Sequence, residues 1–146
     1  MCSLPAPPRD GSRHPVDVGQ CSEAVILAEL VSRGYMVLTP FGVNHRYDLV
    51  IDCGDRFIRA QCKTGGLRQG VIKFRTRSVR SNTKKAIVRG YEGEIDIFLV
   101  FCPDTGKVYV VPIEEATRAQ GSLRVEPTSN GQESGVRWAE DFALPA

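Results

Sequence analysis

Two strands joined by a tight turn are predicted by the stretch Arg46-Tyr-Asp-Leu-Val-Ile-Asp-Cys-Gly-Asp-Arg-Phe-Ile-Arg-Ala-Gln-Cys-Lys-Thr-Gly65. Both halves follow the period of two that side chains adopt along a strand. In the first half, Asp48, Val50 and Asp52 alternate with Leu49 and Ile51. Gly54 tolerates the backbone angles of a short hairpin, so the turn is assigned to Cys53-Gly-Asp-Arg56.

The polar face of the second strand is the first candidate for a functional site. Phe57, Arg59, Gln61 and Lys63 alternate there with Ile58, Ala60 and Cys62. Asp48, at the start of one strand, is therefore expected beside Gln61 and Lys63, near the end of the next. A carboxylate, an amide oxygen and a lysine at one place can hold a metal ion and a phosphate.

The length of 146 residues favours a single domain, large enough to bury about two thirds of the surface of the unfolded chain. Residues 1–15 are rich in proline and polar side chains, and are predicted to form a disordered tail before a domain spanning 16–146. No apolar run approaches the roughly 20 residues that span a bilayer, and no signal-peptide pattern opens the chain. No membrane partner is expected.

The cysteines give no sign of disulfides or zinc. They are odd in number and irregularly spaced, at Cys2, Cys21, Cys53, Cys62 and Cys102. No Cys-x-x-Cys pair is present and there are only two histidines, so a structural zinc site is not expected. The reducing cytoplasm is the expected location.

A strong charge asymmetry lies beneath the formal net charge of +2. From Arg56 to Tyr91 there are eleven Lys and Arg and no Asp or Glu, whereas ten acids and four bases follow Tyr91. A one-sided basic block is typical of a protein that binds a polyanion, most often a nucleic acid. The alternative is a basic surface that only confers solubility.

A helix is predicted from Asp17, where Gln20 completes a capping box, to a stop at Gly34. At about 100° per residue, one broad apolar face holds Cys21, Ala24, Val25, Leu27, Ala28 and Val31. Ser22, Glu29 and Arg33 fall on the opposite, solvated side, together with a misplaced Ile26. Glu23 lies at the edge of the apolar face, where a carboxylate needs a cation or hydrogen-bond donors. The alternative is an ordinary first-turn acid that the helix dipole stabilises.

The remaining elements follow from alternation and breakers. A strand is predicted for Tyr35–Phe41, and Gly65-Gly66 breaks the sheet. In Val71–Arg77, a stripe of Lys73, Arg75 and Arg77 suits contacts with a phosphate backbone, and a basic loop follows from Arg80 to Lys85. Glu94–Cys102 has the continuous apolar run of a strand buried on both faces, with Asp96 as a structural partner for a basic group. The last predicted elements are a return strand (Val108–Val111), a short helix (112–119), a strand (Ser122–Glu126), and a final segment (136–142) that docks Trp138 and Phe142.

Several motifs resemble the PD-(D/E)xK nuclease core. The matching residues are Glu23 on the helix, Asp48 on one strand, and Gln61-Cys-Lys63 on the next. More specifically, the chain from about Asp17 to Phe142 is similar to the group I intron-associated (homing-type) endonucleases of that superfamily. That likeness rests on Ser22-Glu23, Gly34-Tyr35, Pro40-x-Gly42, Asn44-x-Arg46-Tyr-Asp48, Gln61-Cys-Lys-Thr64, Tyr91 with Asp96, and Asn130-x-Gln132 with Val136-Arg-Trp-Ala139. A more distant similarity is to Holliday-junction resolvases.

The resemblance implies an α/β (α+β) fold with a restriction-endonuclease-like core, in which helices flank a central mixed sheet of four to five strands. It also implies a Mg²⁺-dependent endodeoxyribonuclease that cleaves double-stranded DNA, with Mn²⁺ as a possible substitute. Asp48, the Gln61 side-chain oxygen and the Cys62 main-chain carbonyl would ligate the ion, and Glu23 would reach it directly or through water. Lys63 would hold or help deprotonate the attacking water.

Gln61 departs from the general pattern, which has Asp or Glu at this position. A neutral amide removes one charge from the metal site and should weaken binding of Mg²⁺, although glutamine also occurs in the intron-associated branch. Two hypotheses therefore remain open. The chain is an active endonuclease, or it is a DNA-binding module on a nuclease fold that has lost catalysis.

Contacts with DNA are expected from the basic block and from the residues just before Asp48. The candidates are Asn44, Arg46, Arg75, Arg77, Arg80, Asn82, Lys84, Lys85 and Arg89. Since a domain of this size has one active site, cutting both strands needs at least a two-fold dimer. A homo-oligomer, dimer or tetramer, is the expected assembly.

Overall fold

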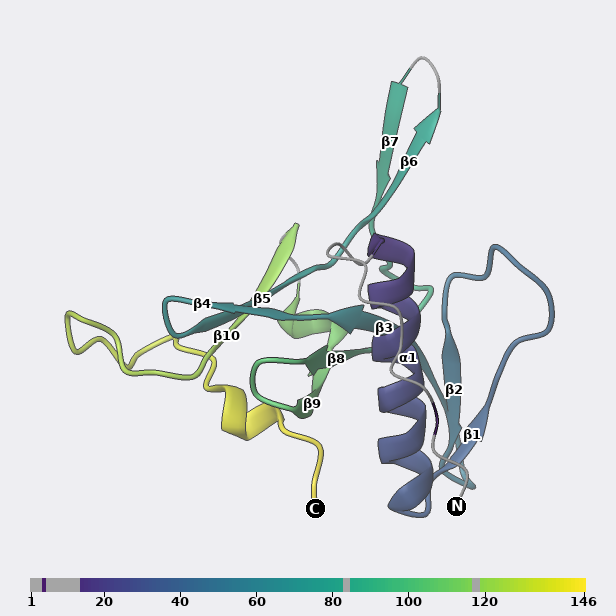
Figure 1. Cartoon of the computed structure of the whole chain (residues 1–146), viewed down its shortest axis with the longest axis horizontal. Coiled ribbons are helices and arrows are strands. Elements are labelled where there is room, and N and C mark those ends of the chain that lie inside the picture. Colours follow the sequence, from purple (N-terminus) through teal and green to yellow (C-terminus); the bar gives the residue numbers. More distant parts are fainter. Residues whose placement is uncertain (1–3, 5–13, 83–84, 117–118) are drawn as a thin grey trace.

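The computed structural model describes Leu4, residues 14–82, 85–116 and 119–146. Figure 1 shows one long helix standing against a sheet, with a β-hairpin projecting from the body. The elements are α1 (Pro15–Ser32), β1 (Met36–Leu38), β2 (Leu49–Asp52), β3 (Phe57–Thr64), β4 (Gly66–Arg68), β5 (Val71–Arg75), β6 (Ser78–Asn82), β7 (Lys85–Arg89), β8 (Ile97–Cys102), β9 (Lys107–Pro112), the 3₁₀-helix η1 (Ile113–Glu115), β10 (Gln120–Arg124) and the 3₁₀-helix η2 (Ala139–Phe142).

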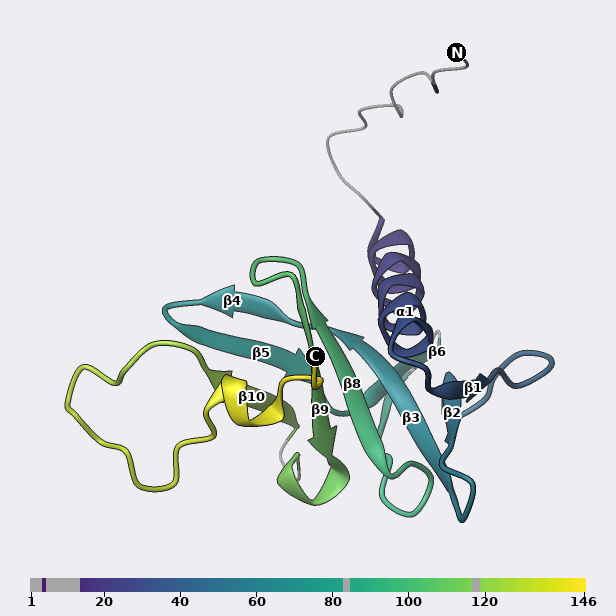
Figure 2. The ribbon, with the colours of Figure 1, turned by 90° about the horizontal axis from the view of Figure 1, so that it is seen from below.

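The central sheet has five strands in the order β1-β2-β3-β8-β9. Only β3 and β8 pair in parallel, and the other neighbours are antiparallel. The predicted mixed sheet is therefore confirmed, and Figure 2 shows β8 lying between β3 and β9. No helix in the described residues is long and apolar enough to cross a membrane.

The hairpin predicted from Arg46 to Gly65 forms β2 and β3, with Leu49 opposite Ala60. Its turn is held by two hydrogen bonds. The Gly54 amide donates to the Asp52 carboxylate at 2.8 Å, and the Cys53 amide donates to the Arg56 carbonyl at 3.0 Å. Gly54 has φ of 84°, in the left-handed region that favours glycine. Asp52 therefore stabilises the hairpin turn, and it lies outside the candidate site.

The two faces of the central sheet bury two separate cores. On one face, Ile26 and Leu30 of α1 pack with Leu49, Ala60 and Leu99. On the other face, a core around Phe98 and Val100 is covered by a second sheet, in the order β10-β5-β4. Strand β8 is thus buried on both faces, as its continuous apolar run predicted.

The predicted buried face of the helix was wrong. Ser22, Ile26 and Leu30 form the buried stripe, whereas Val31 is 56% exposed and Cys21, Ala24 and Ala28 face solvent. Apolar residues occur nearly all round α1, so their angular distribution does not select one face. Contacts with the sheet decide which side of α1 is buried. The Ser22 hydroxyl hydrogen-bonds the Thr64 hydroxyl of β3 at 2.6 Å, so this polar residue can be buried there.

Other predicted boundaries also shift. The helix begins at Pro15, capped by His14, two residues before the predicted start at Asp17. Most of the predicted tail of residues 1–15 lies outside the described residues. Of the helix predicted for 112–119, Ile113–Glu115 form the 3₁₀ turn η1, and residues 117–118 lie outside the described structure. The strand β10 begins at Gln120, where it pairs with β5. The central sheet therefore has α1 on one face and a β-layer, not a helix, on the other.

The segment predicted as a basic loop is a two-stranded hairpin. β6 and β7 pair antiparallel, with Val79 opposite Val88, and the hairpin projects away from the body in Figure 1. Its β-branched residues explain the strands. Strand β4 was not predicted either. It is joined to β5 by Gln69 and Gly70, which have φ of 50° and 72°, as in a two-residue hairpin turn.

Substitution of Ile26 by Ala tests the observed helix face. Ile26 is fully buried, so we expect a loss of about 2–5 kcal/mol in the free energy of unfolding. The matched control is Val31→Ala on the same helix, which should change stability by less than about 0.5 kcal/mol because Val31 is exposed. Urea unfolding followed by circular dichroism measures both. Equal losses in the two variants would contradict the observed helix orientation.

Candidate active site

Asp48 is tied to the neighbouring strand from the entry to β2. Its backbone amide donates to the Ala60 carbonyl at 2.9 Å. Its carboxylate oxygen Oδ2 accepts hydrogen bonds from the Gln61 side-chain amide at 2.7 Å and from the Cys62 backbone amide at 2.8 Å. The predicted meeting of Asp48 with Gln61 is therefore present in the structure. As the structure stands, the Gln61 nitrogen and not its oxygen points at the acid.

Lys63 lies two residues beyond Gln61 along β3 and points to Tyr91. Its ammonium donates to the Tyr91 hydroxyl at 3.2 Å and lies 4.9 Å from the centre of the Tyr91 ring. Lys63 forms no ion pair with the residues that the structure describes. Its positive charge nevertheless acts on Asp48, where it works against the rise in pKa that burial causes.

Glu23 approaches the site from α1, just after Ser22, whose hydroxyl anchors the helix to Thr64. Glu23 and Asp48 line the same pocket of about 240 Å³. Burial raises the pKa of the Glu23 carboxyl, and the negative charge of Asp48 raises it further. The alternative of an ordinary first-turn acid is disfavoured, because Glu23 lies in the third turn of a helix that begins at Pro15.

Burial dominates the electrostatics of Asp48 as well. It raises the pKa of this carboxyl, while the Cys62 amide and the charge of Lys63 act in the opposite direction without cancelling it. Burial followed by the charges of Asp48 and Glu23 also raises the pKa of the Cys62 thiol far above its ordinary value. The thiol therefore stays protonated, and the group that Cys62 could offer to a hard cation is its main-chain carbonyl.

The site offers oxygen ligands that suit a divalent cation. Two acids with raised pKa values lie in one pocket, and a cation between them would relieve both burial and repulsion. No group of three His, Cys, Asp or Glu that could hold a metal occurs within the described ranges. The third side-chain ligand would have to be Gln61, with its amide turned so that the oxygen faces Asp48. The residues thus fit a Mg²⁺-type site with one charge fewer than an all-carboxylate site.

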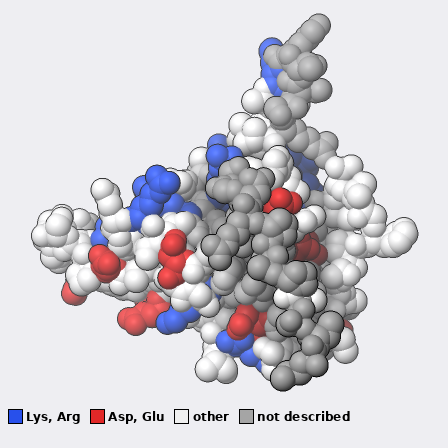
Figure 3. Space-filling view, viewed as in Figure 1, with Lys and Arg blue, Asp and Glu red and all other residues white. Residues whose placement is uncertain are grey.

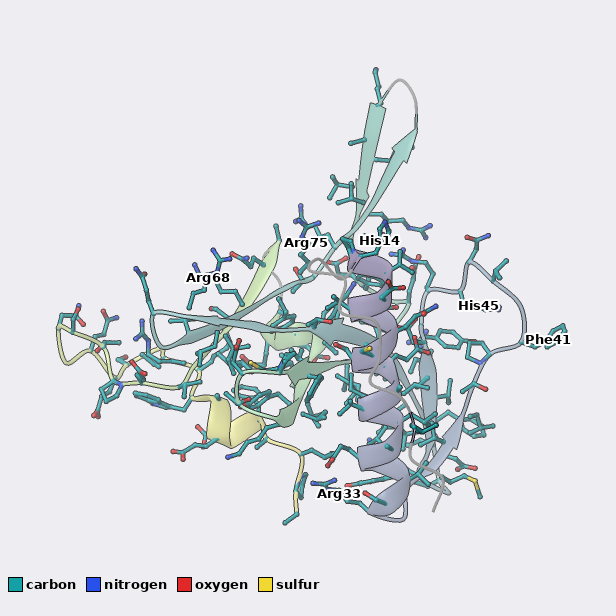
Figure 4. All side chains as sticks on the ribbon, viewed as in Figure 1. His14, Arg33, Phe41, His45, Arg68 and Arg75 are labelled. Atoms are coloured by element: carbon teal, nitrogen blue, oxygen red, sulfur yellow. The ribbon has the colours of Figure 1, made fainter. Side chains whose placement is uncertain are left out.

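A larger and basic groove opens on the Lys63 side. It has a volume of about 530 Å³ and is lined by Lys63, Thr64, Lys73, Phe74, Arg75, Arg77, Ser78, Val79, Tyr91 and Gln120. Figure 3 shows Lys and Arg at the surface over β4 and β5, and Figure 4 places Arg75 on the side of the projecting hairpin. The catalytic candidates therefore lie between an acidic pocket and a basic groove.

The structure separates the predicted DNA-contacting residues into groups. Arg75 and Arg77 line the groove. Asn44 lines the acidic pocket together with His45, which Figure 4 labels on the loop between β1 and β2. Lys85 and Arg89 are exposed on β7, where Arg89 pairs with Glu94. Arg80 and Asn82 belong to β6, but their side chains lie outside the described structure, as does the whole of Lys84.

Arg46 is held by the protein itself. Its guanidinium bonds the Glu94 carboxylate, the Ser78 hydroxyl at 2.8 Å and the Gly90 carbonyl at 2.5 Å, and lies 4.2 Å from the centre of the Tyr91 ring. Hydrogen bonding from Arg46 is the main cause of the lowered pKa of Glu94. Asp96 was predicted to pair with a basic group. That group is Arg59, whose guanidinium nitrogen lies 3.0 Å from an Asp96 carboxylate oxygen.

Two residues of the site were missed as site residues in the sequence. Tyr91 contacts Lys63 and Arg46, and His45 lines the acidic pocket. Lys73 was predicted as part of the cationic stripe with Arg75 and Arg77 but not included among the DNA-contact candidates, and it lines the basic groove. No sequence signal placed Tyr91 beside Lys63, since these residues are 28 positions apart.

The candidate site therefore combines a helix acid, a strand acid and a strand lysine with a basic groove, which is the arrangement expected of a nuclease. In agreement, the family model for PD-(D/E)XK endonucleases matches residues 13–145. The chain belongs to this family, whose members typically use divalent metals. A solved structure of a bacterial homing endonuclease, I-Ssp6803I, matches with a TM-score of 0.70, 18% identity and coverage of 89% of each chain. That likeness confirms the predicted fold. The search of curated proteins found no match.

Substitution of Asp48 by Asn should stabilise the metal-free protein at alkaline pH. The raised pKa means that Asp48 binds its proton more tightly in the folded protein than in the unfolded chain. The stability of the folded protein therefore falls as pH rises through the pKa of folded Asp48. Asparagine carries no charge at any of these pH values, so the variant escapes the cost of burying a charged carboxylate. The variant should therefore melt higher than wild type at pH 8 in EDTA.

The advantage of the variant should shrink as pH falls through the raised pKa of folded Asp48, and should be gone below the ordinary pKa of Asp, 3.8. Mg²⁺ should raise the melting temperature of wild type but not that of Asp48→Asn, because ligand binding stabilises only the protein that binds it. Thermal unfolding with and without Mg²⁺ measures both effects. A variant that melts lower than wild type at pH 8 in EDTA would contradict this account of the buried acid.

Proposed function

We propose that the protein is a Mg²⁺-dependent endodeoxyribonuclease that hydrolyses phosphodiester bonds of double-stranded DNA, with Mn²⁺ able to substitute. The observation that carries the proposal is the contact of the Asp48 carboxylate with the Gln61 side chain and the Cys62 amide, with Lys63 next along β3 in the basic groove. The family match to a PD-(D/E)XK endonuclease supports it.

Asp48 is the central ligand of the proposed ion, because its position is set by two strands. Gln61 contributes its side-chain oxygen and Cys62 its main-chain carbonyl, and Glu23 completes the acidic side from α1. The ion would polarise the phosphate and stabilise the charge that develops on it. Protons bound to Glu23 and Asp48 compete with the cation, and both carboxyls have raised pKa values. Binding of the ion is therefore expected to strengthen as pH rises above those pKa values.

Lys63 acts on the attacking water and on the phosphate. Its ammonium lies at the junction of β3 with the groove, where it can donate a hydrogen bond to a phosphate oxygen or orient a water. A positioned group of this kind contributes about 10²–10⁴-fold to a rate. The role follows from its place beside Asp48, whose pKa already responds to its charge.

The duplex is proposed to follow the basic groove toward the hairpin. Lys73, Arg75 and Arg77 would bind the backbone along β5, and the exposed Lys85 and Arg89 would extend the contact along β7. Arg80, Asn82 and Lys84 belong to the same basic segment and stay in the proposal as DNA contacts. Asn44 would meet the scissile strand from the acidic pocket. Arg46 would act on DNA indirectly, by fixing the base of the hairpin.

A homing-type enzyme is the proposed biological class, in keeping with the fold of the bacterial homing endonuclease. One chain supplies one set of Asp48, Gln61 and Lys63. Cutting both strands of a duplex therefore calls for a homo-oligomer, dimer or tetramer, with two sites related by two-fold symmetry.

A second candidate is a DNA-binding module without catalysis. The feature that favours it is Gln61, whose neutral side chain gives the site one negative charge fewer than an acid at this position would. This candidate predicts salt-sensitive DNA binding without cleavage in any divalent metal. A resolvase-like enzyme, in turn, would cut four-way junctions in preference to linear duplex.

Substitution of Lys63 by Ala should lower the rate of duplex cleavage by about 10²–10⁴-fold. The reason is loss of the ammonium at the reacting phosphate, while the groove that binds DNA is kept. Supercoiled and linear DNA are incubated with wild type and variant in Mg²⁺ or Mn²⁺, and binding is followed by fluorescence anisotropy. The matched control is Lys107→Ala at the start of β9, which lines a different pocket.

Wild-type rates in the Lys63 variant would overturn the assignment of this residue. A wild-type protein that binds duplex but cleaves nothing in any divalent metal would establish the DNA-binding module. Four-way junctions assayed beside linear duplex separate the resolvase-like activity.

Substitution of Arg75 by Ala should weaken duplex binding and lower the salt dependence of the binding constant by about one unit of slope. Arg75 lines the groove and lies on the side of the molecule from which the β6–β7 hairpin projects. Its loss should therefore remove one phosphate contact. The control is Arg33→Ala, because Arg33 is paired with Glu29 near the end of α1. An unchanged slope for Arg75→Ala would place the duplex elsewhere on the surface.

A further inference from the structure

We propose that Tyr91 is a positioning residue for Lys63, and that its hydroxyl oxygen holds the lysine ammonium at the opening of the basic groove. This inference rests on the proposed function, in which Lys63 acts at the phosphate. It assigns to Tyr91 a role in catalysis that is separate from its role in the hydrophobic core.

The contact between Tyr91 and Lys63 has two components. The Lys63 ammonium donates to the tyrosine hydroxyl at 3.2 Å, and it lies 4.9 Å from the ring centre. A cation near an aromatic face is attracted by the ring quadrupole, and the effect grows when the pair is desolvated. Tyr91 is only 4% exposed. The ammonium is therefore held by an immobile group and not by a surface side chain.

The ring of Tyr91 is itself fixed from the protein interior and from Arg46. It meets Phe98 edge-on, with 5.6 Å between ring centres and an angle of 90° between planes. The Arg46 guanidinium lies 4.2 Å from its centre and is anchored in turn by Ser78 and Gly90. Tyr91 thus links Lys63 to a rigid cluster at the base of the β6–β7 hairpin.

Positioning matters here because lysine is long and flexible. Its four-carbon stem carries about 2 kcal/mol of rotamer entropy, and the acids of the site would otherwise compete for the ammonium. The charge of Lys63 already acts on Asp48, yet the hydrogen bond goes to Tyr91. A misplacement of about 1 Å at a reacting centre can lower a rate by as much as about 100-fold. The single oxygen atom of Tyr91 therefore has a measurable expected effect.

Tyr109 provides a matched control in the same core. It is 2% exposed, belongs to the same cluster as Tyr91, and its hydroxyl bonds the Thr105 hydroxyl at 3.0 Å. Tyr91→Phe and Tyr109→Phe each remove one buried hydroxyl and one hydrogen bond. Only the first removes an oxygen that Lys63 contacts. A purely structural role predicts the same behaviour for both variants.

The test compares wild type, Tyr91→Phe and Tyr109→Phe in three measurements. These are the single-turnover cleavage rate at saturating duplex and Mg²⁺, the duplex Kd without divalent metal, and thermal unfolding. We expect Tyr91→Phe to cleave about 10-fold more slowly, with Kd changed less than about two-fold. Tyr109→Phe should keep the wild-type rate. An unchanged rate in Tyr91→Phe, an equal slowing of both variants, or a parallel loss of DNA affinity would overturn the inference.

A readout that needs no cleavage separates this inference from the proposed function. The ¹Hε–¹³Cε NMR signal of Lys63, assigned by its loss in Lys63→Ala, should be shifted upfield by the Tyr91 ring current. In Tyr91→Phe, which keeps the ring, the signal should move toward that of a free lysine because the hydroxyl is gone. A signal that stays in place would overturn the inference even if wild type proves inactive. A signal that moves in a protein that cleaves no DNA would leave the positioning intact and refute the proposed function.

Discussion

Strand β3 is hydrogen-bonded along both edges, and this double pairing places Asp48, Gln61, Cys62 and Lys63 of the candidate site. β2 pairs with it in antiparallel fashion and delivers Asp48 opposite Gln61, while β8 pairs with it in parallel and aligns Lys63 with Val100. The faces of β3 are divided in the same way. Ala60, Cys62 and Thr64 lie toward α1, and Gln61 and Lys63 carry the polar side. Because side chains alternate across a strand, a slip of one residue would exchange these faces and dismantle the site.

The site combines groups that favour function over the stability of the metal-free protein. Burial raises the pKa of both Asp48 and Glu23, so at neutral and alkaline pH their charges oppose folding. Glu94 and Asp96 behave in the opposite way, because bonds from Arg46 and Arg59 lower their pKa values. The second pair stabilises the fold at neutral pH. The first pair stores repulsion that a bound cation would release, which is the pattern of a binding site.

A second rigid cluster lies behind the reacting residues. Arg46, Tyr91 and Glu94 join the base of the β6–β7 hairpin to the interior, and Lys63 contacts the same tyrosine. The hairpin extends the basic segment away from the body. An isolated two-stranded hairpin is only marginally stable, so this hairpin depends on the cluster at its base. That cluster also contacts Lys63, so DNA bound along the hairpin would be linked to the catalytic candidates.

The local pattern of residues was enough to predict the β2–β3 hairpin, the buried β8 strand, the nuclease core and the meeting of Asp48 with Gln61. The nuclease core was predicted from the resemblance of its motifs to a known family. The other features follow from alternation, from turn chemistry at Gly54 and from pairing between strands that are close in sequence. Three-dimensional packing was needed for the rest. The buried side of α1 depends on which of its many apolar residues pack against the sheet. Ser22 is buried with them because its hydroxyl hydrogen-bonds the Thr64 hydroxyl. The contact of Tyr91 with Lys63, and the engagement of Arg46 by Glu94, join residues 28 and 48 positions apart. Contacts at such separations arise only when the parallel pairing of β3 with β8 brings distant segments together, and no short-range pattern encodes them.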